Sequence, residues 1–514
     1  MRARRFSRIG AATAGIAAVA LFSVAGASAT TTINVPCTGQ SDLVAAINAA
    51  NTAGGGMLNL AHRCDYQLTS SPDDSENGLP AITTPITING SQATIDGTNS
   101  FRDFEVDGPG GNLSARDLTI TGGSVQDFGG GIANLDGTVM LDHSQVNGNS
   151  AGVAGGGIAN ATFDPSSVAT LTLRNSSVND NQQTSGDPDT SLGGGGIANV
   201  DGTVTLDHSQ ANGNTAAGFI GGGIANGDFF GSGGQSTLTL DHSQVNGNTL
   251  STGFVGGGIA SGDFMDSGGQ SVLTVDNSQV NGNTAPNAGG GGIQNTLGSA
   301  TVDHSQVNDN TSLNGGGIAS GVQGNPTGTA ELKLSYTEVD GNTATGPGFE
   351  TGVGPVAAGG IANGSDAVID HSQVDNNNAP NGIGAGVVNH GTMSLSHSEV
   401  NGNTASASGV LGSGGGIFNS SGTGPAVLTL DHSKVNRNSA SGDGGGIANG
   451  AAMGKMSLPG GDVSLTHSEV RHNSAAHGGG IFNNGGTVTL SDTNVSGNAV
   501  DNCEPTNSIA GCTG

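Results

Sequence analysis

The sequence predicts an all-β fold, a parallel β-helix solenoid of about 12 to 15 turns, from three observations on one repeated segment. Close copies of GTVTLDHSQANGNTAAGFIGGGIANG, residues 202–227, return along most of the chain. Within this copy the apolar Val204 and Leu206 alternate with Thr205 and Asp207, which is the period of a half-buried strand. The density of glycine and asparagine argues against helix. A single copy cannot bury its apolar face alone, so successive copies must stack and pair their strands in parallel.

Two rows of residues mark the repeat. Each glycine cluster closes on one aliphatic residue, and each unit ends in a V-x-x-N pattern. The aliphatic residues lie at positions 132, 158, 197, 224, 259, 293, 318, 361, 387, 417, 447 and 481, and the asparagines at 149, 181, 214, 248, 283, 310, 342, 377, 403, 438, 473 and 498. Asparagine accepts left-handed backbone angles, and stacked amides can bond to one another. We therefore expect asparagine ladders at the corners of the coil.

The first residues indicate export. Residues 1–29 combine four arginines, a short apolar stretch and Ala27-Ser28-Ala29, which is the pattern of a secretory signal peptide cleaved after Ala29. We expect a secreted, extracellular protein with no membrane span in the mature chain. The pair Arg4-Arg5 leaves the export route open between the general and the twin-arginine pathways.

Four cysteines stand near the two ends of the repeat array. In an exported chain their spacing predicts two local disulfides, Cys37 with Cys64 and Cys503 with Cys512. Four free thiols or one long-range bridge would need a reducing compartment or ends of the solenoid that meet.

Charge and composition exclude some classes of binding partner. The formal net charge is −28, and it becomes −32 once the four arginines of residues 1–29 are removed. Nucleic acid and anionic lipid are therefore poor partners. Tryptophan is absent and tyrosine occurs twice, so the broad aromatic platforms of many sugar-binding sites are missing.

The repeats resemble a known group. GGGIAN, GGGIFN and GGGIQN, followed by LTLDHSQVNGN or VTLSDTNVSGN, are similar to right-handed parallel β-helix proteins of the pectin-lyase-like superfamily, with repeats like those of polymorphic outer-membrane proteins. The resemblance implies a β-helix at 86–500, a cap at 30–85 and a disulfide tail at 501–514. In the cap it implies a helix over 41–54. Ser41 would be its N-cap, and its core-facing side would consist of Leu43, Val44, Ile47 and Ala50.

Enzymes of this superfamily are polysaccharide lyases and hydrolases, so the resemblance raises the question of catalysis. Lyases of this type pair several calcium-binding carboxylates with a basic residue, and the hydrolases use clustered aspartates. Arg174, Arg437 and Arg471 each stand alone in a repeat. The acidic loop with Asp73, Asp74 and Glu76 could hold calcium, but a solvated loop explains it better. We therefore expect no catalytic constellation, no resident metal and no cofactor.

Three hypotheses for function follow. The first is a structural, adhesive or surface-binding protein that contacts an extracellular polysaccharide or a cell-surface component. The alternative is a divergent polysaccharide lyase or glycoside hydrolase. The third is an ice- or surface-binding rod, because threonines would stack in three consecutive turns, as Thr170-x-Thr172, Thr203-x-Thr205 and Thr237-x-Thr239. The oligomeric state is open.

Phenylalanines grouped in adjacent turns are the best candidates for a contact surface. GDFFGSGGQS and GDFMDSGGQS place four apolar side chains at one shared corner, and GFIGGG with GFVGGG places two more at another. The candidate residues are Phe229, Phe230, Phe264 and Met265 at the first corner, and Phe219 and Phe254 at the second. The alternative is that these loops fold down and bury their own phenylalanines.

Eight histidines occupy one equivalent position of the repeat. They are His143, His208, His242, His304, His371, His397, His432 and His467, and the other turns carry Asn175, Asn277, Tyr336 and Asp492. A general acid is not needed eight times, so we interpret the row as a structural ladder. Successive rings should lie about 5 Å apart and be partly buried, with the preceding aspartates pointing the opposite way. Metal bound between stacked rings is the alternative interpretation.

Overall fold

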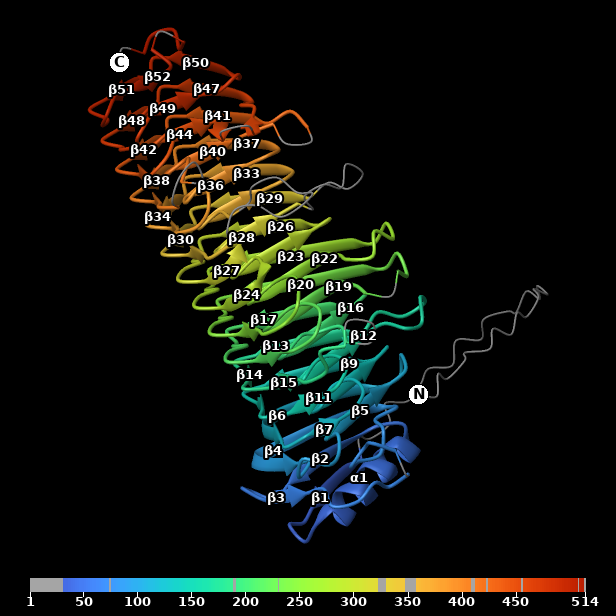
Figure 1. Ribbon diagram of the computed structural model, residues 1–514. Helices are drawn as coiled ribbons and strands as arrows, with labels where there is room; N and C mark the ends of the chain where they lie inside the picture. Colours follow the sequence, from blue (N-terminus) through green and yellow to red (C-terminus); the bar gives the residue numbers. More distant parts are fainter. Residues whose placement is uncertain are drawn as a thin grey trace, which may run out of the picture.

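The computed structural model shows an elongated coil that rises from one end of the chain to the other (Figure 1). It describes residues 31–73, 75–187, 191–229, 231–321, 330–346, 357–407, 412–421, 424–453, 456–506 and 508–512. The predicted signal peptide lies outside these residues. In the described part, no helix is long and apolar enough to cross a membrane.

The chain is a right-handed parallel β-helix, as predicted. Each regular turn passes through four strand positions, which stack from turn to turn into four sheets. We name them sheets I, II, III and IV in the order in which the chain meets them. All of their recorded pairings are parallel, whereas the side hairpin of β45 (Ala451–Met453) and β46 (Met456–Leu458) is antiparallel.

Sheet I holds the longest strands and has 19 members. They are β1 (Thr32–Val35), β2 (Gly56–Leu60), β3 (Asp65–Gln67), β4 (Pro85–Asp96), β6 (Asn112–Thr121), β9 (Thr138–Asp142), β10 (Gln145–Asn147), β13 (Thr170–Arg174), β14 (Ser177–Asn179), β17 (Thr203–Asp207), β20 (Gln235–Asp241), β23 (Gln270–Asp276), β26 (Ser299–Asp303), β29 (Glu331–Ser335), β33 (Asp366–Asp370), β37 (Thr392–Ser396), β41 (Val427–Asp431), β47 (Asp462–Thr466) and β50 (Thr487–Ser491).

Sheet II follows a bend after sheet I. Its six strands are β30 (Glu338–Asp340), β34 (Gln373–Asp375), β38 (Glu399–Asn401), β42 (Lys434–Asn436), β48 (Glu469–Arg471) and β51 (Asn494–Ser496). Single bridges such as Gln210 with Gln244 connect this row to β14.

Sheet III has 11 short strands. They are β7 (Ser124–Val125), β11 (Ser150–Ala151), β15 (Gln182–Gln183), β18 (Thr215–Ala216), β21 (Thr249–Leu250), β24 (Thr284–Gly289), β27 (Thr311–Asn314), β31 (Thr343–Ala344), β35 (Asn378–Ala379), β39 (Thr404–Ala405) and β43 (Ser439–Ala440).

Sheet IV has 14 strands that begin with the aliphatic row in most turns. They are β5 (Phe104–Asp107), β8 (Ile132–Leu135), β12 (Ile158–Ala161), β16 (Ile197–Val200), β19 (Ile224–Asp228), β22 (Ile259–Asp263), β25 (Ile293–Thr296), β28 (Ile318–Ser320), β32 (Ile361–Asn363), β36 (Val387–Asn389), β40 (Ile417–Asn419), β44 (Ile447–Asn449), β49 (Ile481–Asn483) and β52 (Cys503–Glu504).

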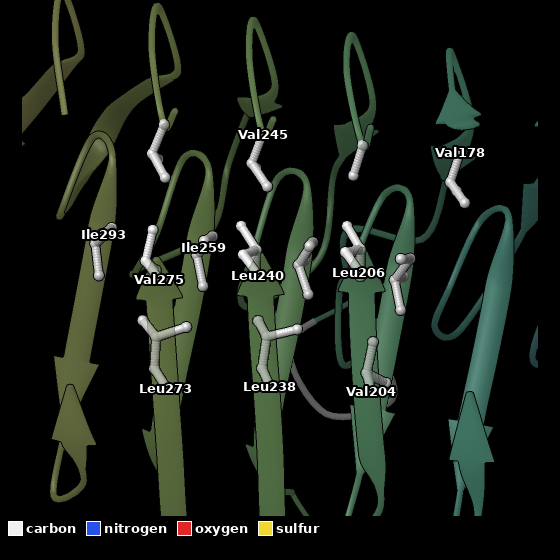
Figure 2. Close-up of a cluster of buried hydrophobic side chains, with 14 of the residues drawn as sticks. Val178, Val204, Leu206, Leu238, Leu240, Val245, Ile259, Leu273, Val275 and Ile293 are labelled. Atoms are coloured by element: carbon white, nitrogen blue, oxygen red, sulfur yellow. The ribbon is translucent and has the colours of Figure 1, made fainter. Parts of the chain in front are cut away.

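The core is a stack of aliphatic side chains inside the coil. Val204 and Leu206 of sheet I and Ile224 of sheet IV are fully buried, as predicted. Figure 2 shows the same arrangement in successive turns, with Val245 facing Leu240 from the next side of the coil. Because each turn buries only a few side chains, the turns depend on one another for stability.

The predicted asparagine ladder is present and buried. The backbone N–H of Asn214 and its side-chain Nδ2 donate to Asn248 Oδ1, at 2.9 and 3.0 Å, and the same pattern recurs from Asn149 to Asn498. Asn214 Nδ2 also donates to the carbonyl of Val178 at 2.9 Å. These bonds satisfy polar groups that the corner removes from water.

The amino-terminal end is closed by the single described helix, α1 (Gln40–Ala53), which carries the predicted inner face. Its start differs from the prediction: Gly39 is the N-cap, without a side-chain cap, and Ser41 lies inside the first turn. Leu43 and Ile47 are buried, whereas Val44 is half-buried. The adjoining strand β1 already pairs with β2, so the coil begins before the predicted residue 86.

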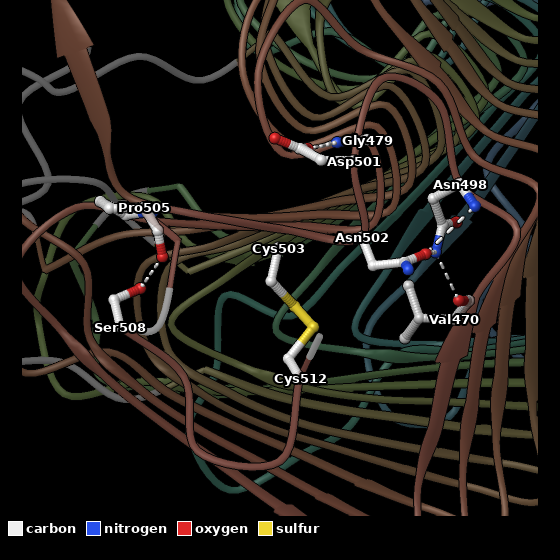
Figure 3. The surroundings of a disulfide bond; sticks show 9 residues. All are labelled: Val470, Gly479, Asn498, Asp501, Asn502, Cys503, Pro505, Ser508 and Cys512. Carbon is white, nitrogen blue, oxygen red and sulfur yellow. Dashed lines mark hydrogen bonds between the residues drawn. A yellow bond between two sulfur atoms is a disulfide. The ribbon is translucent and has the colours of Figure 1, made fainter. Parts of the chain in front are cut away.

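Both predicted disulfides are confirmed. Cys37 bonds to Cys64 in the cap, and Cys503 bonds to Cys512 in the tail. Figure 3 shows the second disulfide beside Asn502, whose Oδ1 accepts a hydrogen bond from Asn498 Nδ2 at 3.1 Å. The tail thus supplies the last member of the asparagine ladder and covers the open end of the coil.

Candidate functional site

Loops of different length leave the corner between sheets IV and I, which we call the loop corner. Residues 162–169 connect β12 to β13, and residues 264–269 connect β22 to β23. Between them, β16 and β17 are connected by only Asp201 and Gly202. A short connection between long ones leaves a hollow on the outside of the coil.

That hollow is a cleft of about 550 Å³. It is lined by Thr162, Phe163, Pro165, Ser167 and Val168 from the first loop, by Ser232, Gly233 and Gly234 from the loop before β20, and by Asp201, Thr203, Gln235 and Thr237. Phe163 and Val168 are 50% and 58% exposed. Sites of this size that combine an apolar wall with a few polar groups are typical of small-ligand binding.

Buried aspartates hold the loop before β20 in place. Ser232 Oγ donates to Asp201 Oδ2 at 2.6 Å, and the backbone N–H of Gly233 donates to Asp228 Oδ2 at 2.7 Å. Asp228 pairs in register with Asp263, whose Oδ2 accepts two backbone N–H groups of the next loop. Burial, together with Asp228 and Asp263, raises the pKa of Asp201. The cleft wall is therefore fixed before any ligand arrives.

The predicted phenylalanine patch is divided between buried and exposed members. Phe229 is 3% exposed and stacks on the half-buried Phe264, with ring centroids 5.5 Å apart. Phe219 contacts Phe254 at 5.1 Å. Phe229, Phe219 and Phe264 pack in one cluster with small and aliphatic residues, which include Val200, Ile220, Ala225 and Ala260. The two corners that we expected to be separate thus share one outer core.

Two members of the predicted patch remain open to solvent. Phe254 and Met265 are each 59% exposed. Phe230 lies outside the described residues. Sequence reasoning missed Phe163 and Val168, which stand alone in TFDPSSV rather than in a repeated pair. The only sequence signal for these two residues was that their segment is inserted between two regular strands.

The histidine row lies at the bend between sheets I and II, which we call the histidine corner. All twelve residues of the row adopt a left-handed backbone, with φ from 45° to 50°. Asparagine tolerates this conformation best, and histidine and aspartate are also enriched there. The serine that follows accepts a backbone hydrogen bond across the turns, as Ser243 Oγ does from Ser209 N at 3.0 Å. The row is thus a conformational element of the coil.

The rings of the row stack along the rod. Centroid distances are 4.8 Å for His208 with His242, and from 4.7 to 5.1 Å along the run His304, Tyr336, His371, His397, His432 and His467. The spacing agrees with the expected 5 Å. The side chains are about half exposed, from 43% at His371 to 61% at His143, so they are partly buried at most.

The aspartates before the row differ from expectation. Instead of pointing away, Asp207 Oδ1 lies 2.6 Å from His208 Nδ1, and Asp431 Oδ1 lies 2.9 Å from His432 Nδ1. The left-handed residue breaks the alternation of the strand, so neighbouring side chains meet. Hydrogen bonds from Ser396 and His371 hold the pKa of Asp370 below its ordinary value.

The three arginines that stand alone in the sequence repeats lie at separate places in the coil. Arg174 lies on the outer face of sheet I, whereas Arg471 ends β48 of sheet II and Arg437 follows β42. Arg174 instead shares a groove of about 220 Å³ with Arg116 and Asp142, which pair in register on adjacent strands. Sequence reasoning missed Arg116 because it lies in an irregular opening turn.

The acidic loop of the cap shows hydrogen bonds within the protein. Asp73 Oδ1 accepts bonds from Ser71 and Ser75, and the Ser75 contact is the main cause of its lowered pKa. Glu76 Oε1 accepts the backbone N–H of Gln126 at 3.1 Å. Asp74 lies outside the described residues. The described groups of three close metal-ligating side chains lie elsewhere, on the histidine corner and its aspartates.

Comparisons with known proteins add one likeness. No family model matches the chain, and no curated protein matches it. Among solved structures it is similar to the A-modules of two Azotobacter vinelandii mannuronan C-5 epimerases, AlgE4 and AlgE6, at 13% and 10% identity with TM-scores of 0.36 and 0.22. Each match covers 89% of this chain and 94% of the other. The fold assignment rests on the strand pairing above, and these scores carry no argument about activity.

Proposed function

We propose that this chain is an extracellular, non-catalytic binding protein that holds a polysaccharide or another cell-surface component at its loop corner. The observation that carries the proposal is the cleft beside Thr203, with an apolar wall and a lining of hydroxyl and amide groups. A sugar ring presents C–H groups on its faces and hydroxyls at its edge, so it suits such a lining. Two disulfides agree with an oxidising, extracellular location.

The exposed apolar residues near the cleft support the same surface. Phe163, Phe254 and Met265 are all at least half exposed, in a chain with 14 phenylalanines and no tryptophan. Phe163 and Met265 lie at the loop corner, after β12 and after β22, whereas Phe254 precedes β22 at the adjoining corner between sheets III and IV. A long partner could therefore contact the cleft and the neighbouring turns at once.

A substitution that fills the cleft tests the proposal. Untagged, folded protein is tested against pectic, alginate and neutral glycans and against cells, as wild type and as Thr203→Lys. The control is Thr205→Lys, which lies on the same face of β17 but outside the cleft. We expect at least about tenfold weaker binding for Thr203→Lys only, because the new side chain occupies the cleft. Equal binding by both variants, or no retention of the wild type by any glycan or cell, would contradict the proposal.

The enzymatic alternative has one structural basis, the groove of Arg116, Asp142 and Arg174. Paired arginines suit a uronate carboxylate. Incubation with the same glycans, with and without calcium, should produce neither unsaturated products nor new reducing ends. Turnover that Arg174→Ala abolishes would establish the enzyme instead.

The register of the strands supports the ice-binding alternative. One threonine column continues through five consecutive turns, as Thr172, Thr205, Thr239, Thr274 and Thr301. A regular hydroxyl array of this kind could order water. Thermal hysteresis in solution that Thr239→Lys removes would favour this function, and no hysteresis would exclude it.

A further inference from the structure

On four consecutive turns of the histidine corner, two groups each bring an aspartate and two histidines together. Asp370, His371 and His397 form one group, on β33 and β37, and Asp431, His432 and His467 form another, on β41 and β47. In each group one ligand atom from every residue lies within 4.8 Å of the others. The aspartates are half-buried and the histidines exposed, so an ion could reach them from solvent. A third group, Asp276, Asp303 and His304, offers only one imidazole and is not part of the proposal.

Asp431 is the centre of the second group. Its Oδ1 lies 2.9 Å from His432 Nδ1 on the same turn and 3.8 Å from His467 Nδ1 on the next. The two rings are 4.7 Å apart at their centroids. Parallel pairing of β41 with β47 fixes the two backbones, so the three donors start close together.

The movement that metal binding requires is small. Zinc–nitrogen and zinc–oxygen bonds are about 2.0 to 2.2 Å, which places two donors of a tetrahedral ion about 3.4 Å apart. The Asp431 contact with His432, at 2.9 Å, is already shorter, and that with His467, at 3.8 Å, exceeds that value by only about 0.4 Å. The side chains of His432 and His467 are each 50% exposed, so they can turn without disturbing the core.

The donor set decides the class of ion. Imidazole nitrogens suit zinc, copper and nickel, whereas calcium and magnesium prefer oxygen ligands throughout. The chain carries a formal charge of −28, which attracts cations toward the rod. Three protein donors leave further positions of the ion open to water or to a ligand.

We propose that Asp431, His432 and His467 bind one divalent transition-metal ion, and that Asp370, His371 and His397 bind a second. The hydroxyl of Ser396 already donates a hydrogen bond to Asp370 Oδ1, so we expect the Asp431 site to bind the metal ion more tightly than the Asp370 site. The His208 and His242 pair stacks at a similar distance but does not bring three ligand atoms together with its aspartates. Stacking alone therefore does not make a site.

Calorimetric titration of untagged protein with Cu²⁺, Ni²⁺ and Zn²⁺ at pH 7.5 tests the proposal. We expect two equivalents of Cu²⁺ in the wild type, one in His467→Asn, one in His397→Asn and none in the double variant. Asparagine occurs naturally in this row, at Asn175 and Asn277 with φ of 47° and 46°, so these variants should keep the fold. Equal thermal melting of the apo proteins checks that point.

His143→Asn is the matched control, because His143 has one aspartate contact and an asparagine in the next turn. It should keep both equivalents. Electron paramagnetic resonance of bound Cu²⁺ should show nitrogen coupling that weakens in His467→Asn. Equal uptake by the wild type and the double variant, or equal loss in His143→Asn and His467→Asn, would overturn the proposal. So would displacement of Cu²⁺ by millimolar Ca²⁺.

Discussion

The histidine corner and the loop corner belong to the same coil but behave differently along it. At the histidine corner, two residues at equivalent positions turn the chain in all twelve turns that carry the row, with a left-handed backbone at the first. At the loop corner, the connection ranges from the two residues after β16 to the twelve between β44 and β47, which include the β45–β46 hairpin. The two corners differ in their hydrogen bonds. At the histidine corner, bonds between successive turns fix the backbone. At the loop corner, the loops project from the coil, and their backbone N–H groups bond to nearby aspartates such as Asp228 and Asp263.

Insertion of two residues should give the largest difference in stability between the two corners. A Gly-Ser insertion between His242 and Ser243 should cost more than about 4 kcal/mol, because it displaces the buried Leu240 or Val245 and the serine bonds. The same insertion between Asp266 and Ser267 should cost less than about 1 kcal/mol, because lengthening an exposed loop costs little entropy. Urea denaturation measures both. Similar losses at the two corners would refute the distinction.

The buried Phe229 at the loop corner and the exposed Phe254, which precedes β22 at the adjoining corner, should differ. Phe229→Ser should destabilise by about 3 kcal/mol, because it removes a buried ring that stacks on Phe264. Phe254→Ser should cost less than about 1 kcal/mol, since that side chain is 59% exposed. Thermal melts of the two variants give the comparison, and a larger loss at Phe254 would contradict the packing described.

At the histidine corner, backbone angle should matter more than side-chain chemistry. His208→Val should cost about 1 to 2 kcal/mol, because a β-branched residue is strained at a φ of 50°. His208→Asn should stay within about 0.5 kcal/mol of the wild type, since asparagine accepts that angle. If the two substitutions were equally costly, the ring itself and not the backbone would hold the corner.

A further test concerns the pH dependence of stability. Burial first, and then Glu399, Asp340 and Glu338, raise the pKa of Asp375 to about 6. The folded protein therefore holds a proton that the unfolded chain releases, and stability declines as pH rises from about 4 through about 6.

Asp375→Asn should remove that decline and melt higher than the wild type at pH 7.5, with little difference near pH 4. The amide can still accept the bond that Asn401 N donates at 2.8 Å, as asparagines do in other turns. Asp366→Asn, at an exposed carboxylate on β33, is the control and should leave the profile unchanged. A higher melting temperature of Asp375→Asn at pH 4 only would reverse the sign and refute the argument.

Local periodicity made much of this protein predictable. The alternation around Val204 and Leu206 identified the inner face, and the recurring asparagines identified a buried ladder. The cysteine spacing identified both disulfides. The start of α1 was misjudged because Ser41 resembles a cap in sequence, whereas the chain uses Gly39.

The candidate site was less predictable because it depends on contacts between different turns. Phe219 and Phe254 occupy equivalent sequence contexts, GFIGGG and GFVGGG, yet Phe219 is half-buried and Phe254 is exposed. The cleft exists because a two-residue connection lies between longer loops, and its wall at Phe163 belongs to no repeat.

The sequence by itself determined the repeat and the strand alternation, because each depends on residues adjacent along the chain. The left-handed positions differ from the expectation: they lie at the histidine row and at the residue before each ladder asparagine, such as Gly213 before Asn214. Only the tertiary structure decided which side chains meet across turns. His467 and Asp431 are 36 positions apart in the sequence, and parallel strand pairing brings them into contact. Parallel pairing likewise forms the groove between Arg116 and Arg174. Such contacts follow from register and loop length together, and no single repeat contains that information.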